Sequence, residues 1–127
     1  MNKVFRSIFA LPLAALLVAG LTPSADAIAR GRYDGEWSVI IYTQRGDCDR
    51  ALRYSLRIVD NQVLAEQASY QLRGAVAPSG GIRVVVAEGG RSASGSGRLS
   101  GNTGRGQWRT STGECAGVWT AERRAAW

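Results

Sequence analysis

The sequence predicts an all-β fold: a single eight-stranded antiparallel up-and-down barrel with one disulfide. Apolar and polar residues alternate with period two in several runs, as in Tyr54, Leu56 and Ile58, which is typical of half-buried antiparallel strands. Turn-forming residues separate these runs at short intervals. A flat meander would leave two exposed edges, and closure into a barrel removes both of them.

Residues 1–27 are expected to be a secretory signal peptide. Lys3 and Arg6 form a positive start, an apolar run follows, and Ala25-Asp26-Ala27 supplies the small residues at which signal peptidase cuts. The apolar run is shorter than the roughly 20 residues that a membrane-spanning helix needs. The mature protein is therefore predicted to be periplasmic or secreted, without a membrane span. Its expected parts are an N-terminal extension (28–34), a barrel domain (35–124) and a C-terminal tail (125–127).

The expected strands lie between clear turn signals. Asp60-Asn61, Pro78 to Gly81, Gly89-Gly90 and Gly101-Asn102 are residues that turns favour. No stretch after residue 27 shows a convincing helical period. The predicted strands are 37–43, 51–59, 62–65, 69–77, 82–88, 91–99, 103–111 and 116–123.

The glycine- and serine-rich stretch 89–106 fits two interpretations. One is a flexible linker. The other is a pair of bent strands, in which glycine permits the close backbone approach of a small barrel. Ala93 and Leu99 share one parity with the glycines between them, and Trp108 follows at once. We therefore expect strands here.

Cys48 and Cys115 are the only cysteines. In an exported protein they meet an oxidising environment, so they are expected to form a disulfide. Cys48 falls in the loop after the first predicted strand, and Cys115 falls in the loop before the last. Closure of the barrel brings these two loops to the same end, where a bridge is geometrically easy.

Composition excludes several kinds of chemistry. All 14 basic residues after position 27 are arginines, and the chain contains no histidine. The predicted mature protein thus lacks a Ser-His-Asp or Cys-His centre, a histidine metal site, a Walker-A lysine and a Schiff base. Haem ligation is left only to tyrosine. We expect no catalysis, no metal and no cofactor.

Three Gly-x-Trp motifs recur, beginning at Gly35, Gly106 and Gly117. In each motif, the glycine shares a strand face with the tryptophan and leaves room for another ring or for backbone. The simplest interpretation is that these tryptophans pack in the core. Trp119 is expected to be one such core ring. Arg123 shares the parity of Trp119 and is therefore expected to face inward. Closure of the barrel places Arg123 beside Trp37, where a guanidinium can stack on the indole.

A Gly-x-Trp that opens the first strand, together with an arginine on the last strand, resembles the calycin superfamily. That group includes lipocalins, avidins and secreted bacterial metalloprotease inhibitors. The resemblance rests on Gly35, Trp37 and Arg123 and implies an eight-stranded meander barrel that binds at its mouth or ends. The long span between the cysteines departs from the inhibitors, and no biotin-contact string is present. The chain also resembles short exported bacterial proteins, some labelled for haem utilisation or adhesion.

The leading functional prediction is non-catalytic binding of a small ligand or an exported partner at the barrel mouth, lined by Tyr42, Tyr54 and Trp108. One alternative is a secreted protease inhibitor that acts through residues 28–32. Another is an envelope or adhesion protein that binds anionic polysaccharide through outward arginines; nucleic acid is not the expected partner. Codon usage in a GC-rich genome competes as an explanation for the arginines. The arginines on outward positions are Arg53, Arg57, Arg73, Arg83, Arg98, Arg105 and Arg109.

Overall fold

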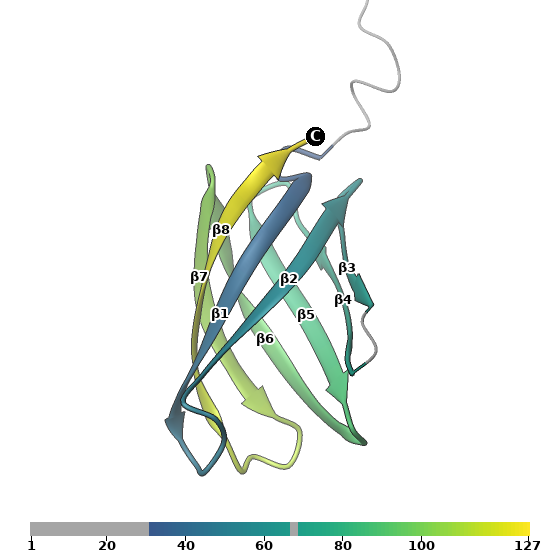
Figure 1. Cartoon of the computed structure of the whole chain (residues 1–127). Helices are drawn as coiled ribbons and strands as arrows, with labels where there is room; N and C mark the ends of the chain where they lie inside the picture. Colours follow the sequence, from purple (N-terminus) through teal and green to yellow (C-terminus); the bar gives the residue numbers. More distant parts are fainter. Residues whose placement is uncertain (1–30, 67–68) are drawn as a thin grey trace, which may run out of the picture.

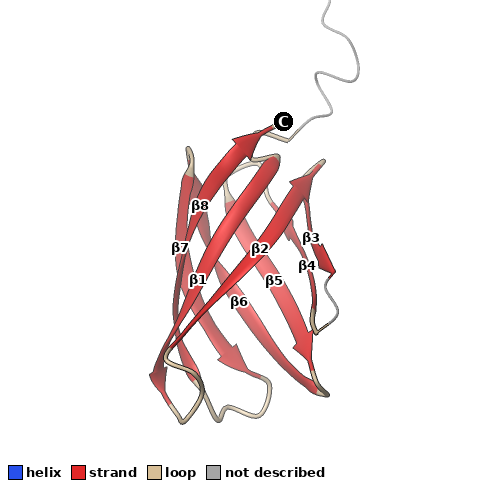
Figure 2. Cartoon of the chain, in the orientation of Figure 1, coloured by secondary structure: helices blue, strands red, loops and turns tan. Residues whose placement is uncertain are grey.

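The computed structural model describes residues 31–66 and 69–127, which form a closed antiparallel barrel (Figure 1). The described chain consists of strands joined by loops and turns (Figure 2). The predicted signal peptide and residues 28–30 of the predicted extension lie outside the described residues. In the part that the structure describes, no helix has the length and apolar character needed to cross a membrane.

In the described part of the chain, eight strands follow one another around the barrel, each pairing with its neighbours in sequence, and the last pairs with the first. The predicted up-and-down topology is therefore confirmed. The strands are β1 (Gly35–Arg45), β2 (Ala51–Val59), β3 (Gln62–Glu66), β4 (Gln71–Val76), β5 (Gly81–Glu88), β6 (Arg91–Ser100), β7 (Thr103–Thr110) and β8 (Ala116–Ala126).

Strand ends differ from the sequence prediction most at β1, β4 and β8, and β1 begins two residues earlier and ends two residues later than predicted. β8 continues three residues beyond the predicted end at residue 123, because Ala125 and Ala126 pair with Glu36 and Gly35 of β1. The predicted C-terminal tail is therefore mostly strand. β4 is shorter than predicted at both ends. The glycine-rich stretch forms β6 and β7 in continuous register, so two strands joined by a turn, and not a linker, occupy residues 91–110.

The two ends of the barrel carry different features. The turns that join β2 to β3 and β6 to β7 lie at one end, together with the C-terminus and the start of the described chain; we call this the terminal end (Figure 1). The β1–β2 and β7–β8 loops lie at the opposite end, which we call the disulfide end. There Cys48 is bonded to Cys115, as predicted.

Three tryptophans fill much of the interior, and each indole N–H donates to a backbone carbonyl. Trp37 Nε1 donates to the carbonyl of Tyr33 (2.8 Å), and Trp119 Nε1 donates to the carbonyl of Ser96 (3.2 Å). Trp108 Nε1 donates to the carbonyl of Tyr42 in β1. The large rings thus bury apolar area without leaving their polar atoms unpaired.

Two of the Gly-x-Trp motifs fit together across strands. β7 and β8 are antiparallel, and their register sets Gly106 opposite Trp119 and Trp108 opposite Gly117. The ring of Trp119 lies against Gly106, where an added Cβ would be 2.6 Å from the indole. An added Cβ at Gly117 would meet the β1 backbone that Trp108 contacts. Gly106 therefore makes room for the ring of Trp119, and Gly117 permits the close approach of the β1 backbone.

The third Gly-x-Trp motif meets Arg123 at the terminal end. Trp37 is opposite Arg123 in the β1–β8 register, and the guanidinium carbon lies 5.2 Å from the centroid of the indole. The guanidinium also donates to the carbonyls of Arg32, Asp34 and Gly101. Arg123 therefore ties the segment before β1 and the β6–β7 turn to the last strand.

Candidate functional site

The predicted mouth residues Tyr54 and Trp108 lie at the disulfide end, but their polar groups already have partners. The Tyr54 hydroxyl bonds to the Glu88 carboxylate (3.2 Å), and its ring meets the ring of Tyr70 edge-on at 4.7 Å between centroids. Trp108 Nε1 donates to the carbonyl of Tyr42 (2.9 Å). Both side chains are therefore part of the packed interior of the barrel.

Tyr42 departs from the prediction that its ring lines the mouth. Trp37, Val39 and Ile41 face the interior in alternation, which places Tyr42 on the opposite face of β1. Its side chain is accordingly 39% exposed. Only the backbone carbonyl of Tyr42 contacts another predicted mouth residue, Trp108. The structure therefore does not bring the three rings together.

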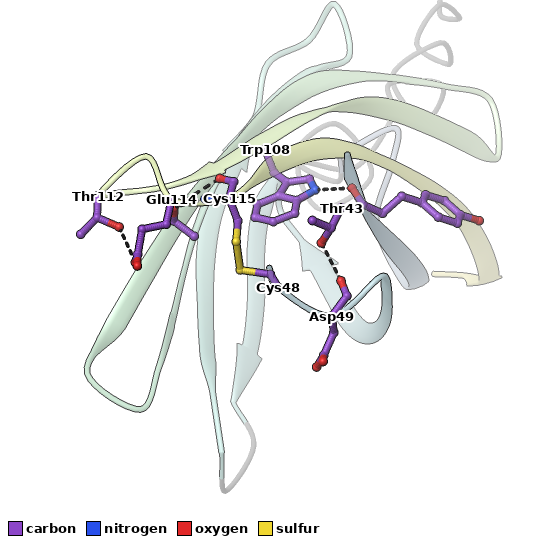
Figure 3. The surroundings of a disulfide bond; sticks show 9 residues. Thr43, Cys48, Asp49, Trp108, Thr112, Glu114 and Cys115 are labelled. Carbon is purple, nitrogen blue, oxygen red and sulfur yellow. Dashed lines mark hydrogen bonds between the residues drawn. A yellow bond between two sulfur atoms is a disulfide. The ribbon is translucent and has the colours of Figure 1, made fainter. Parts of the chain in front are cut away.

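The loops at the disulfide end are fastened to one another (Figure 3). The Cys48–Cys115 bond joins the β1–β2 loop to the β7–β8 loop. The Thr43 hydroxyl donates to the carbonyl of Asp49 (2.5 Å), and the Thr112 hydroxyl donates to the Glu114 carboxylate (2.9 Å). The rim beside the β1–β8 seam is thus held by a covalent bond and local hydrogen bonds.

Tyr54 gives the stability of the barrel a defined pH dependence. Burial raises the pKa of the Tyr54 phenol to about 12, and the Glu88 carboxylate adds to this rise. Because an unfolded tyrosine has a pKa of about 10, the contribution is complete below pH 10 and is lost as the pH rises through about 12. We expect Tyr54→Phe to remove this part of the alkaline fall in the free energy of unfolding, measured by urea denaturation at several pH values.

Tyr42→Phe is the matched control, because it removes an exposed hydroxyl from a neighbouring part of the barrel. It should keep the wild-type pH dependence. An equally steep alkaline fall in the Tyr54→Phe variant would contradict the assignment.

The raised pKa of Tyr54 also opposes its use as a phenolate ligand of haem iron.

A first hollow, which we call groove A, lies on the outer wall over β4 to β8 and the end of β1. Its volume is about 760 Å³, and its lining includes four arginines and no carboxylate. The strand register sets their order: one row of outward residues runs Arg73, Val85, Ser94, Arg109, Ala116 and Arg45. Arg83 lies in the adjacent row, opposite Ser96. Groove A is therefore a concentrated positive surface.

A second hollow, groove B, lies nearer the terminal end over β1, β2, β6, β7 and β8. Its volume is about 690 Å³, and its lining includes Arg53, Arg98, Arg105 and Arg124. The single carboxylate in this lining belongs to Glu122, which is 3.1 Å from the Arg124 guanidinium. Arg98 and Arg105 are directly opposite each other, an arrangement of like charges that costs stability and that a bound anion relieves.

The outward arginines have few acidic partners. Within residues 31–66 and 69–127, the single ion pair is the one between Arg124 and Glu122. All seven arginines predicted on outward positions are exposed on strands. Six of them line groove A or B, and Arg57 lies outside both grooves, opposite Glu36. Most of the outward arginines thus line one of the two grooves.

Sequence reasoning missed Arg45 and Arg124 as members of this surface. Arg124 shares the outward parity of β8, and extending the predicted strand by one residue would have found it. Arg45 follows a register shift between Thr43 and Arg45 in the pairing of β1 with β8, which simple alternation does not reveal. Both lie at strand ends, where sequence patterns are weakest.

The fold and these grooves together define a class: a small closed antiparallel barrel with a strongly cationic outer wall. Comparison of the chain with protein-family models, with curated proteins and with solved structures finds no match. In the described part of the chain, no group of three or more histidine, cysteine, aspartate or glutamate residues is placed to hold a metal ion.

Proposed function

We propose that this protein is a non-catalytic binding protein that holds anionic polymers on its outer wall. The observation that carries the proposal is groove A, whose lining presents four arginines and no carboxylate. Guanidinium groups pair bidentately with carboxylate, sulfate and phosphate, and an unbalanced positive groove raises the local concentration of anions.

The outer wall is favoured over the barrel mouth as the binding site because the polar side-chain atoms of the two regions differ in their hydrogen-bond partners. At the mouth, the Tyr54 hydroxyl and the Trp108 N–H are bonded within the protein. On the wall, Arg73, Arg83 and Arg109 are exposed and lie in a groove without an acid. A ligand at the mouth would have to replace existing bonds, whereas an anion in groove A gains new ones.

The setting that fits this function is an oxidising compartment, the periplasm or the cell exterior. The Cys48–Cys115 disulfide supports this placement, because such bonds persist in oxidising environments. The Trp37–Arg123 contact between the first and last strands supports a calycin-like membership. In this proposal the barrel is a rigid scaffold, and its outer surface carries the function.

The test is binding of heparin to the full mature chain and to the Arg73→Gln/Arg83→Gln/Arg109→Gln variant. The wild type should be retained on a heparin column, with an affinity that falls steeply as salt rises. The variant should bind roughly 10- to 100-fold more weakly, because each exposed guanidinium contact contributes up to about 1 kcal/mol. Calorimetric titration at two salt concentrations measures the change.

A variant with the same loss of charge outside both grooves is the control: Arg32→Gln/Arg50→Gln/Arg91→Gln. These arginines are exposed and line neither groove. The control should lose less than about threefold in affinity. If both triple variants weaken equally, net charge alone governs binding and groove A is not the site. Elution of the wild type from the heparin column at low salt would contradict the proposal itself.

A further inference from the structure

Grooves A and B have four strands in common. Both take lining residues from β1, β6, β7 and β8, groove A nearer the disulfide end and groove B nearer the terminal end. On β7, Arg105 of groove B and Arg109 of groove A both point outward, with Gln107 between them. Four residues of strand separate the two arginines by about 13 Å. The two grooves are therefore consecutive parts of one face.

The residues between the arginines are suited to hydrogen bonding with sugars. Hydroxyl and amide groups both donate and accept, as sugar hydroxyls require. In groove A such groups belong to Ser94, Ser96, Gln44 and Gln107. In groove B they belong to Ser100, Thr103 and Thr120, whereas Ser38 is buried and accepts from Arg53. Positive charge thus alternates with neutral polar groups along this face.

Aromatic side chains are sparse on the same face. Trp108 is the aromatic residue in the lining of groove A, and its ring is buried. Tyr42 is exposed at the end of the outward row that contains Ser96 and Gln107 of groove A, opposite Val118 of β8. One exposed ring offers a platform for the apolar side of a sugar. Single-stranded nucleic acids, by contrast, are held by successive aromatic platforms.

We infer that grooves A and B form one continuous track for a polysaccharide that carries regularly spaced carboxylate or sulfate groups, bound at both grooves at once. This inference rests on the proposed function and specifies its ligand. The spacing of about 13 Å between Arg105 and Arg109 requires anionic groups separated by more than a single sugar ring. A polymer with one charged unit in each disaccharide meets that requirement.

The test uses heparin-derived oligosaccharides of defined length, titrated calorimetrically into the mature chain. A disaccharide spans one groove, whereas an octasaccharide spans both. The octasaccharide should therefore bind the wild type at least about tenfold more tightly, because its second contact is intramolecular. Arg98→Gln/Arg105→Gln removes the facing arginines of groove B and should abolish most of this gain. The control Arg57→Gln/Arg91→Gln loses the same charge outside both grooves and should keep it.

Three results would overturn the track. The first is an octasaccharide affinity equal to that of the disaccharide, and the second is an equal loss in the groove B variant and its control. In either case, heparin retention that still depends on groove A would leave the proposed function standing. The third is tighter binding of single-stranded oligothymidine of equal charge, which would replace the polysaccharide with nucleic acid. Failure of the wild type to bind heparin at all would overturn the proposed function and the track together.

Discussion

Replacing Cys48 and Cys115 with serine is expected to lower the free energy of unfolding by about 4 kcal/mol. The bond links residues separated by 67 positions in sequence, so it removes much of the freedom of the unfolded chain. It also joins the two loops beside the seam where β8 closes on β1. Chemical denaturation of the oxidised wild type and of the double variant measures the difference.

The double-serine variant should still fold into the same barrel. β1 and β8 pair along most of their lengths without help from the bond, and the tryptophan core is unchanged. Wild-type protein in reducing buffer is the matched control and should show the same loss of stability. A loss of less than about 1 kcal/mol would mean that the loop constraint persists in the unfolded state or is offset by strain.

Gly106→Ala is expected to lower the free energy of unfolding by about 3 kcal/mol, at the upper end of what overpacking a core costs. The added Cβ would meet the backbone carbonyl of Ser96 and would lie 2.6 Å from the ring of Trp119. Neither group can move easily, because the carbonyl belongs to β6 and the indole is packed inside the barrel. Urea denaturation, followed by tryptophan fluorescence, measures the loss.

Gly81→Ala is the matched control for this substitution. Gly81 also lies in a strand, but an added Cβ there would contact only the Ser79 hydroxyl, at 3.7 Å. The control should change stability by less than about 0.5 kcal/mol, because the new methyl group meets no obstacle and restricts the unfolded chain slightly. Equal effects of the two substitutions would show that Gly106 is not required for packing of Trp119.

Much of the barrel follows from local pattern. The alternation around Tyr54 and Leu56 predicts β2 with its observed ends, and turn residues such as Asp60 and Asn61 separate β2 from β3. The ends of β4 and β8 were not predictable in the same way. Whether a chain end such as Ala126 continues a strand depends on a partner, here Gly35 of β1, and not on its own side chain.

The candidate site was predictable only in part. Parity identifies Arg73, Arg98 and Arg105 as outward residues, and the structure places all three on the wall. Parity alone does not show which arginine lies beside which. That depends on cross-strand register, which sets Arg98 opposite Arg105 and brings Arg73 into the same row as Arg109. Parity also places Tyr42 on the outer face, although the initial prediction assigned it to the mouth.

The sequence by itself determined the all-β class, the number and order of the strands, and the pairing of Cys48 with Cys115, because these depend on local alternation, turn chemistry and the presence of only two cysteines. The tertiary structure alone decided which residues gather into grooves A and B and how Gly106 and Trp119 fit together. The physical reason is that both depend on register. Residues far apart in the chain become neighbours only when hydrogen bonding between strands sets them side by side.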